Sequence, residues 1–104
     1  MSRKRIFESM IADNVAKIAS GLENPDDFNT PILASHVIEA VKKIGINLHT
    51  TKEGLLICYF CNKGPFTKKG YYLHLIRSHY YDLIDSVVRE SERIASSSKD
   101  VGSL

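Results

Sequence analysis

The chain has 104 residues, of which 43% are hydrophobic and 25% are charged. This length supports one domain rather than two, and the composition is ordinary for a folded protein. No apolar run reaches the ~20 residues that cross a bilayer, and no apolar core follows the basic N-terminal residues. We therefore expect neither a transmembrane protein nor a secretory signal, and the two cysteines, Cys58 and Cys61, are too few for a disulfide framework.

The net charge of +2 is unevenly distributed along the chain. Residues 1–51 carry equal numbers of basic and acidic side chains, and residues 82–104 carry an acidic excess. Residues 52–81 instead carry five basic side chains and one acidic side chain. The basic ones are Lys52, Lys63, Lys68, Lys69 and Arg77. The charge of this middle segment favours an anionic partner, although a solvated charged surface is the simpler alternative.

The first helical pattern begins near Arg3. Apolar residues recur at steps of three to five from Ile6 to Leu22, which predicts an amphipathic helix closed by Gly21. The basic residues 3–5 either start this helix or add a second basic arm. Residues 23–29 are dense in turn-forming residues and are predicted to form a loop.

A second, shorter helix follows the loop. Thr30 and Pro31 are typical of a helix N-cap and first turn, because proline has no N–H to leave unpaired there. Apolar positions between residues 33 and 44 have helical spacing, and Gly45 is predicted to end the helix.

The hydrophobic period then changes from that of a helix to that of strands. Residues 46–48 and 55–57 are predicted to form two strands, joined by a glycine-bearing turn at 51–54. His49 falls in this region and His36 in the second helix, and we expect both histidines to be ordinary solvated or hydrogen-bonded residues.

The longest helical pattern runs from about Lys68 to Ser91 or beyond. Its apolar residues, spaced mostly by three and four, are Leu73, Ile76, Tyr80, Leu83, Val87 and Ile94. We expect this stripe to pack on the first two helices, with a homodimer through the C-terminal helix as the alternative. Residues 96–104 are small and polar and are predicted to form a flexible tail.

Two cysteines and two histidines have the spacing of a zinc site. Cys58 and Cys61 are separated by two residues, twelve residues follow before His74, and four more precede His79. Two thiolates and two imidazoles in a tetrahedron suit Zn²⁺ and leave no open position, so such a site builds structure and does not activate water. A redox Cys-x-x-Cys pair is the alternative, but no βαβ pattern surrounds it. We expect one Zn²⁺ per chain.

Residues 55–80 resemble the C2H2 zinc-finger family, and all four ligand positions match. The resemblance implies a ββα unit with zinc between hairpin and helix, used on DNA or RNA and sometimes on proteins. Phe66 lies one position later than the family's aromatic core residue, and Tyr71 occupies the position of its usual leucine. Both departures indicate an altered finger core with the metal ligands retained.

The spacing of the two histidines raises a geometric question. Residues five apart on a regular α-helix point about 140° away from each other, so His74 and His79 cannot both face one metal from such a helix. Because the apolar pattern continues past Tyr80, we predict an uninterrupted helix with a wide π-type turn between the two histidines.

The finger helix is poorly equipped to read bases. Its base-facing positions by the family pattern would be Thr67, Lys69, Gly70 and Leu73. Only Lys69 has a long donor, and one finger covers about three base pairs. We therefore expect nucleic-acid binding through phosphates, with DNA favoured over RNA and a role in transcription regulation. The candidate contacts are Lys52, Lys63, Thr67, Lys68, Lys69 and Arg77.

Two alternatives accompany this interpretation. A zinc-stabilised protein–protein interaction module, or a small subunit of a larger assembly, is the main one. An enzyme with a small-molecule substrate is not expected, because no nucleophile–base pair, paired carboxylates or phosphate-binding glycine loop stands out. We expect an intracellular protein, cytoplasmic in an archaeal or viral setting and nuclear in a eukaryotic one.

These elements predict an α+β fold. Two N-terminal helices are expected to precede one ββα zinc finger, and a long C-terminal helix to continue from the finger helix. We predict a single domain over residues 1–95. Its parts are a helical segment 1–45, the finger 46–80 and the helix extension 81–95.

Overall fold

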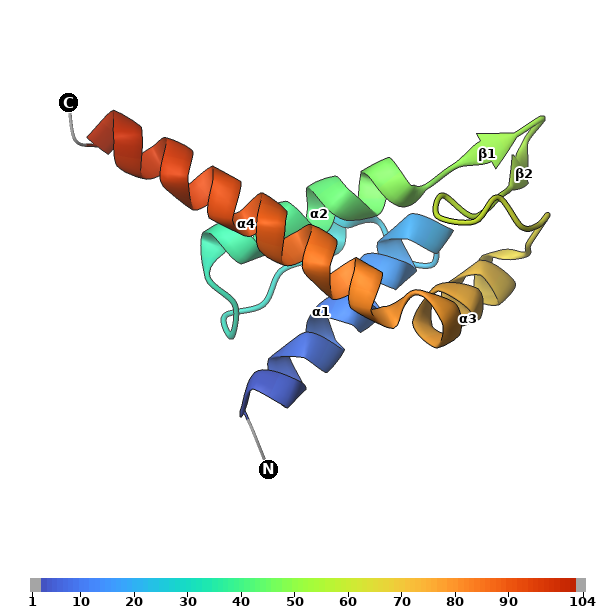
Figure 1. Ribbon diagram of the computed structural model, residues 1–104, viewed down its shortest axis with the longest axis horizontal. Helices are drawn as coiled ribbons and strands as arrows, with labels where there is room; N and C mark the ends of the chain where they lie inside the picture. The colour runs from blue at the N-terminus through green and yellow to red at the C-terminus, as the bar shows by residue number, and fades with distance from the viewer. Residues whose placement is uncertain (1–2, 103–104) are drawn as a thin grey trace.

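The computed structural model describes residues 3–102, with side chains described for residues 7–96. Its elements, in chain order, are α1 (Arg3–Ser20), the short 3₁₀ helix η1 (Pro25–Asp27), α2 (Ser35–Leu48), β1 (Thr51–Lys52), β2 (Leu55–Leu56), α3 (Lys68–Ser78) and α4 (Tyr80–Gly102). The predicted fold class is confirmed: two N-terminal helices, a β-hairpin and two further helices form a mostly helical α+β protein (Figure 1).

The core lies where α1, α2 and α4 pack together, and α3 adds to it against α1. Its fully buried side chains include Val15, Val41, Leu83, Val87, Tyr71 and Leu75. The hairpin and α3 lie at the end of the molecule opposite the C-terminal end of α4 (Figure 1). No helix within residues 3–102 is both long enough and apolar enough to cross a membrane.

The end of α1 confirms the predicted glycine stop. Gly21 has φ of +86°, and its N–H donates to the carbonyl of Ile18 at 3.1 Å. The N–H of Leu22 donates to the carbonyl of Lys17 at 2.9 Å. This pair of bonds satisfies the last carbonyls of the helix, and a residue with positive φ is needed to form it. The side chains of Ile6 and of the basic residues 3–5 lie outside those described.

The boundaries of α2 differ from the prediction at both ends. The helix begins at Ser35 with Ala34 as N-cap, so Thr30 and Pro31 do not start it. Instead, the hydroxyl of Thr30 accepts a hydrogen bond from the N–H of Ile32 at 3.3 Å, which is a local turn. Gly45 does not end the helix, which continues to Leu48.

Gly45 lies inside α2 because α1 approaches it closely. A Cβ at this position would lie 2.5 Å from Cγ2 of Ile18, which is closer than real contacts allow. The predicted strand at 46–48 is also wrong, because these residues form the last turn of α2 and Leu48 is buried in the core.

The hairpin is short and tightly turned. Strands β1 and β2 are antiparallel, with Thr51 opposite Leu56 and Lys52 opposite Leu55. Glu53 and Gly54 connect them with φ of 56° and 81°, as the preferred two-residue hairpin turn requires. Leu56 also forms a single bridge to Phe66, which brings the start of the following helix beside the hairpin.

The finger helix does not continue as predicted, since α3 ends at Ser78 and α4 begins at Tyr80. His79, between them, has φ of −131° and ψ of 26°, outside the helical region. Its N–H caps α3 by donating to the carbonyl of Leu75 at 2.9 Å, and its carbonyl accepts from the N–H of Leu83 at 3.0 Å. The predicted π-type turn is therefore replaced by a one-residue break that re-aims the His79 side chain.

The apolar stripe of α4 packs within the chain. Leu83 and Val87 are fully buried, and Ile94 is partly buried against the same core. Packing on the first two helices, the preferred interpretation, is confirmed for Leu83 and Val87, and self-association through α4 stays a prediction. Of the predicted tail 96–104, residues 96–102 form the last part of α4, and residues 103–104 lie outside the described residues.

Candidate metal centre

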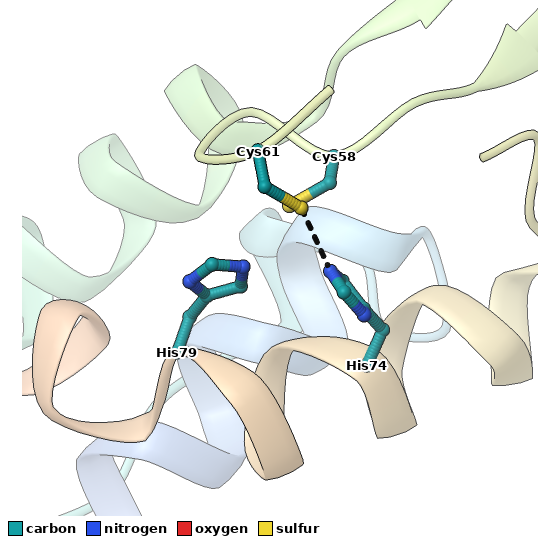
Figure 2. A group of neighbouring side chains, drawn as sticks. All are labelled: Cys58, Cys61, His74 and His79. Atoms are coloured by element: carbon teal, nitrogen blue, oxygen red, sulfur yellow. Dashed lines mark hydrogen bonds between the residues drawn. The ribbon is translucent and has the colours of Figure 1, made fainter. Parts of the chain in front are cut away.

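Four side chains from three parts of the chain converge on one point (Figure 2). Cys58 and Cys61 lie in the turn that follows β2, His74 lies on α3, and His79 lies at the break before α4. Their ligand atoms are all within 4.8 Å of one another. In a tetrahedral zinc site the ligand atoms lie roughly 3.3–3.8 Å apart, so only a small contraction would bring these four onto one ion.

The cysteine turn is closed by its own backbone. The N–H of Cys58 donates to the carbonyl of Lys63 at 2.8 Å, and the N–H of Asn62 donates to the carbonyl of Cys58 at 2.9 Å. Asn62 has φ of 62°, a left-handed conformation that asparagine tolerates better than most residues. This turn presents both sulfur atoms toward the two histidines (Figure 2).

The two thiols differ in their electrostatic surroundings. The backbone N–H of Lys63, followed by the ring of His79, lowers the pKa of the Cys61 thiol to about 6. Burial raises the pKa of the Cys58 thiol, while the backbone N–H groups of Cys61 and Phe60 oppose that rise. Cys61 is thus prepared to be a thiolate at neutral pH, whereas Cys58 would release its proton when a metal binds.

The Nε2 atoms of the two histidines differ in their partners. Nε2 of His74 lies 3.3 Å from Sγ of Cys61. Nε2 of His79 is buried and has no hydrogen-bond partner among the described residues. Buried polar atoms are normally satisfied, so a metal ion at this point would supply the missing partner.

Asp82, which the sequence pattern did not single out, lies behind His79. Its Oδ2 is 3.4 Å from Nδ1 of His79. A carboxylate that accepts from one ring nitrogen of a histidine directs the other nitrogen toward a metal. The signal available in the sequence was an acidic residue three positions after a candidate ligand at a helix start.

Aromatic rings cover the two histidines. Phe66 stacks on His74 with ring centroids 4.7 Å apart, and Phe60 stacks on His79 at 4.9 Å. Phe66 also stacks on Tyr71 at 5.8 Å. Phe66 thus contacts both the candidate ligand His74 and the buried Tyr71.

The donor set fits Zn²⁺. Two sulfur and two nitrogen donors form a closed four-ligand set, which is the usual composition of a structural zinc site. The structure thus brings together all four predicted ligands in one Cys2His2 cluster that could hold one metal ion, next to a β-hairpin and a helix, as in a zinc-finger-like site. No protein-family model, curated protein or solved structure matches this chain.

The predicted phosphate contacts surround this cluster in the sequence. They are Lys52 on β1, Lys63 in the cysteine turn, Thr67 at the N-cap of α3, Lys68 and Lys69 in its first turn and Arg77 in its last. All six side chains are exposed. The Thr67 hydroxyl accepts from the N–H of Gly70 at 3.0 Å, so this residue already has a structural role as the cap of α3.

The remaining histidines lie apart from the cluster. His49 follows α2 as its C-cap, and its Nδ1 lies 2.7 Å from the carbonyl oxygen of Ala19. This contact ties the end of α2 to the end of α1 and confirms that His49 is an ordinary hydrogen-bonded residue. His36 is half-buried in the first turn of α2.

Proposed function

We propose that this protein is a zinc-stabilised nucleic-acid-binding protein of the C2H2 type that contacts mainly phosphates. One Zn²⁺ would be held by Cys58, Cys61, His74 and His79. Because four protein ligands leave no open position for water, the metal would stabilise structure and would not catalyse a reaction.

The observation that carries this proposal is a set of free cations on the segments that carry or adjoin the four ligands. Lys52, Lys63, Lys68, Lys69 and Arg77 are exposed, and none has an ion-pair partner among residues 7–96. Elsewhere in that range, cations that do pair with carboxylates are Lys17, Lys43, Arg89 and Arg93. Exposed lysines without partners are available to displace counterions from a phosphate backbone.

The types of side chain favour phosphate contact over base reading. Of the helix positions that face bases in the family, only Lys69 has a long donor, and Thr67 already caps the helix. Duplex DNA is the proposed partner, with regulation of transcription as the proposed process. Such a protein should bind unrelated sequences with similar affinity.

A zinc-stabilised protein-interaction module is the second candidate. It is favoured by large apolar side chains that are exposed to solvent and lie close in sequence to the candidate ligands. Leu55 is 53% exposed, Tyr59 is 55% exposed and Tyr81 is 77% exposed. Aromatic and aliphatic side chains exposed in this way are typical anchors for a protein partner.

The two candidates are separated by a binding assay with a charge-matched control. The parent and the double variant Lys68→Ala/Lys69→Ala are titrated with duplex DNA, single-stranded DNA and RNA at several salt concentrations. We expect weaker binding for every sequence. The slope of log K against log salt should fall by about one for each phosphate that the variant no longer neutralises.

The control is Arg89→Ala/Arg93→Ala, which removes the same charge from two cations of α4 that are paired with carboxylates. It should bind nearly as the parent does. If both double variants bind every nucleic acid like the parent, or if the parent binds none, the proposal fails and the protein-interaction module becomes the better candidate.

A further inference from the structure

Tyr71 connects the two halves of the metal site. It lies on α3, three residues before His74, so the two side chains share one side of the helix. Its ring is completely buried and stacks on Phe66. The leucine usual at this position in the zinc-finger family could fill the same space but would have no polar group.

The Tyr71 hydroxyl makes two hydrogen bonds to backbone groups of other elements. It donates to the carbonyl of Leu48, the last residue of α2, at 2.7 Å. It accepts from the N–H of Tyr59, the residue directly after Cys58, at 3.2 Å. The Leu48 carbonyl also accepts from the Thr50 hydroxyl at 3.1 Å, whereas the Tyr59 N–H has no second partner among the described residues.

This arrangement fixes the position of Cys58 relative to His74. One hydrogen bond holds the peptide group that follows Cys58, and the helix that carries Tyr71 also carries His74. The other hydrogen bond holds both to the end of α2 in the helical body. A metal site is preorganised when groups behind its ligands keep the ligands in place.

We propose that Tyr71 is a positioning residue for the metal centre, whose hydroxyl sets the cysteine turn at the distance from α3 that metal binding requires. The inference rests on the zinc site of the proposed function and on no property of the nucleic-acid interface. Metal affinity then depends on the docking of α2 against the finger as well as on the four ligands.

The test compares Tyr71→Phe with Tyr72→Phe. Both variants lose one hydroxyl from α3 that hydrogen-bonds another element, because the Tyr72 hydroxyl donates to Asp13 on α1. Only Tyr71 touches the cysteine turn. Zn²⁺ affinity is measured by competition with a chelator, and the Co²⁺ absorption spectrum reports the ligand geometry.

We expect Tyr71→Phe to bind Zn²⁺ about tenfold more weakly, with an altered Co²⁺ spectrum, and Tyr72→Phe to bind like the parent. Parent affinity and spectrum in Tyr71→Phe would overturn the inference, as would an equal loss in both variants, since affinity would then follow overall stability. A parent that binds neither metal would overturn the zinc site itself, so the two failures are distinguishable.

A second measurement on the parent covers the case in which Tyr71→Phe does not fold. The Tyr59 side chain is exposed, yet its amide donates to a buried hydroxyl. We expect hydrogen exchange at this amide to be slow in the zinc-loaded protein, and slower than at the neighbouring exposed turn. Rapid exchange at the Tyr59 amide would show that this amide does not form a stable hydrogen bond with the Tyr71 hydroxyl.

Discussion

A single residue outside the helical conformation allows His74 and His79 to face the same point. In a regular helix they would diverge by about 140°. The dihedral angles of His79, −131° and 26°, turn its ring back toward the cysteines, and Asp82 holds the ring from behind. The convergence of His74 and His79 thus depends on the non-helical backbone of His79 and on the Asp82 carboxylate.

We predict that Asp82→Ala lowers Zn²⁺ affinity by about tenfold, because the His79 ring loses the carboxylate that orients it. The loss is measured by chelator competition. Asp85→Ala is the matched control, since Asp85 lies on the same helix and pairs with Arg89 at 3.0 Å without contacting a ligand. Equal affinities for the two variants would mean that the Asp82 carboxylate does not support the site.

The ligands were predictable from sequence because metal coordination needs particular residue types at a local spacing. Cys58, Cys61, His74 and His79 all converge as that spacing implies. The residues behind them were not predictable, because their roles depend on elements that meet only in the folded chain. Tyr71, for example, bonds a carbonyl 23 positions away.

Helices α1 and α2 approach closely because a glycine replaces a side chain at their contact. A Cβ on Gly45 would lie 2.5 Å from Cγ2 and 2.7 Å from Cβ of Ile18. The Ile18 Cβ belongs to the base of a branched side chain and cannot swing away as a flexible chain end could. Sequence patterns treat glycine as a helix stop, and only tertiary packing shows why it lies within the helix here.

We predict that Gly45→Ala destabilises the protein by about 1–2 kcal/mol, because an overpacking cost of roughly 2–3 kcal/mol exceeds the ~1 kcal/mol that alanine gains in helix propensity. The free energy of unfolding in urea measures the effect. Asn47→Ala, an exposed position on the same helix, should change the stability by no more than roughly 0.5 kcal/mol. A more stable Gly45→Ala variant would contradict the close approach of the two helices.

A charged group joins α2 to α4. Glu90 on α4 accepts from Nε of Arg93 at 3.1 Å and lies 3.0 Å from Nζ of Lys43 on α2. Its side chain is only 13% exposed. Arg93 first, and then Lys43, lower the pKa of Glu90 from its ordinary value of 4.5 to about 2.

The pH dependence of this ion pair has a definite sign. A lowered pKa in the folded state means that the ionised carboxylate stabilises the fold above pH 4.5, and that this contribution disappears as the pH falls through about 2. We predict that Glu90→Gln is less stable than the parent at pH 6 and that the difference shrinks steadily toward pH 2. Unfolding in urea at each pH measures it.

Glu92→Gln, which removes an exposed carboxylate from the same helix, is the control for general charge effects. Because each comparison is made at one pH, loss of metal in acid affects parent and variant alike. A difference between Glu90→Gln and the parent that stays constant down to pH 2 would contradict the lowered pKa.

The metal cluster lies at one end of a continuous core. Cys58, Tyr71 and Leu75 are buried together with Val15 and Leu83 of the helical body. The contacts among α1, α2 and α4 do not pass through any of the four ligands. Removal of the metal should therefore affect the finger more than the helical body.

We predict that a chelator increases hydrogen exchange at residues 51–66 and leaves the buried parts of α1, α2 and α4 protected. Short strands and a tight turn have few apolar contacts of their own, so a bound Zn²⁺ would supply much of their order. Exchange with and without chelator, followed by mass spectrometry, measures the change. Uniform loss of protection would show that the whole chain folds only with metal, and no change would show that the metal is not structural.

The break at His79 also restricts where insertions and deletions can occur during evolution. One residue inserted between Ser78 and Tyr80 would change the position of His79 or the placement of α4 relative to α3. Such a change would disturb the metal ligand set or the packing of the buried Leu83 and Val87, and deletion of His79 would remove the ligand itself. The connection from Leu22 to Ala34 carries no ligand, and most of its residues other than the buried Phe28 and Leu33 are exposed. Insertions and deletions in related chains should therefore accumulate at its exposed positions and spare the junction between α3 and α4.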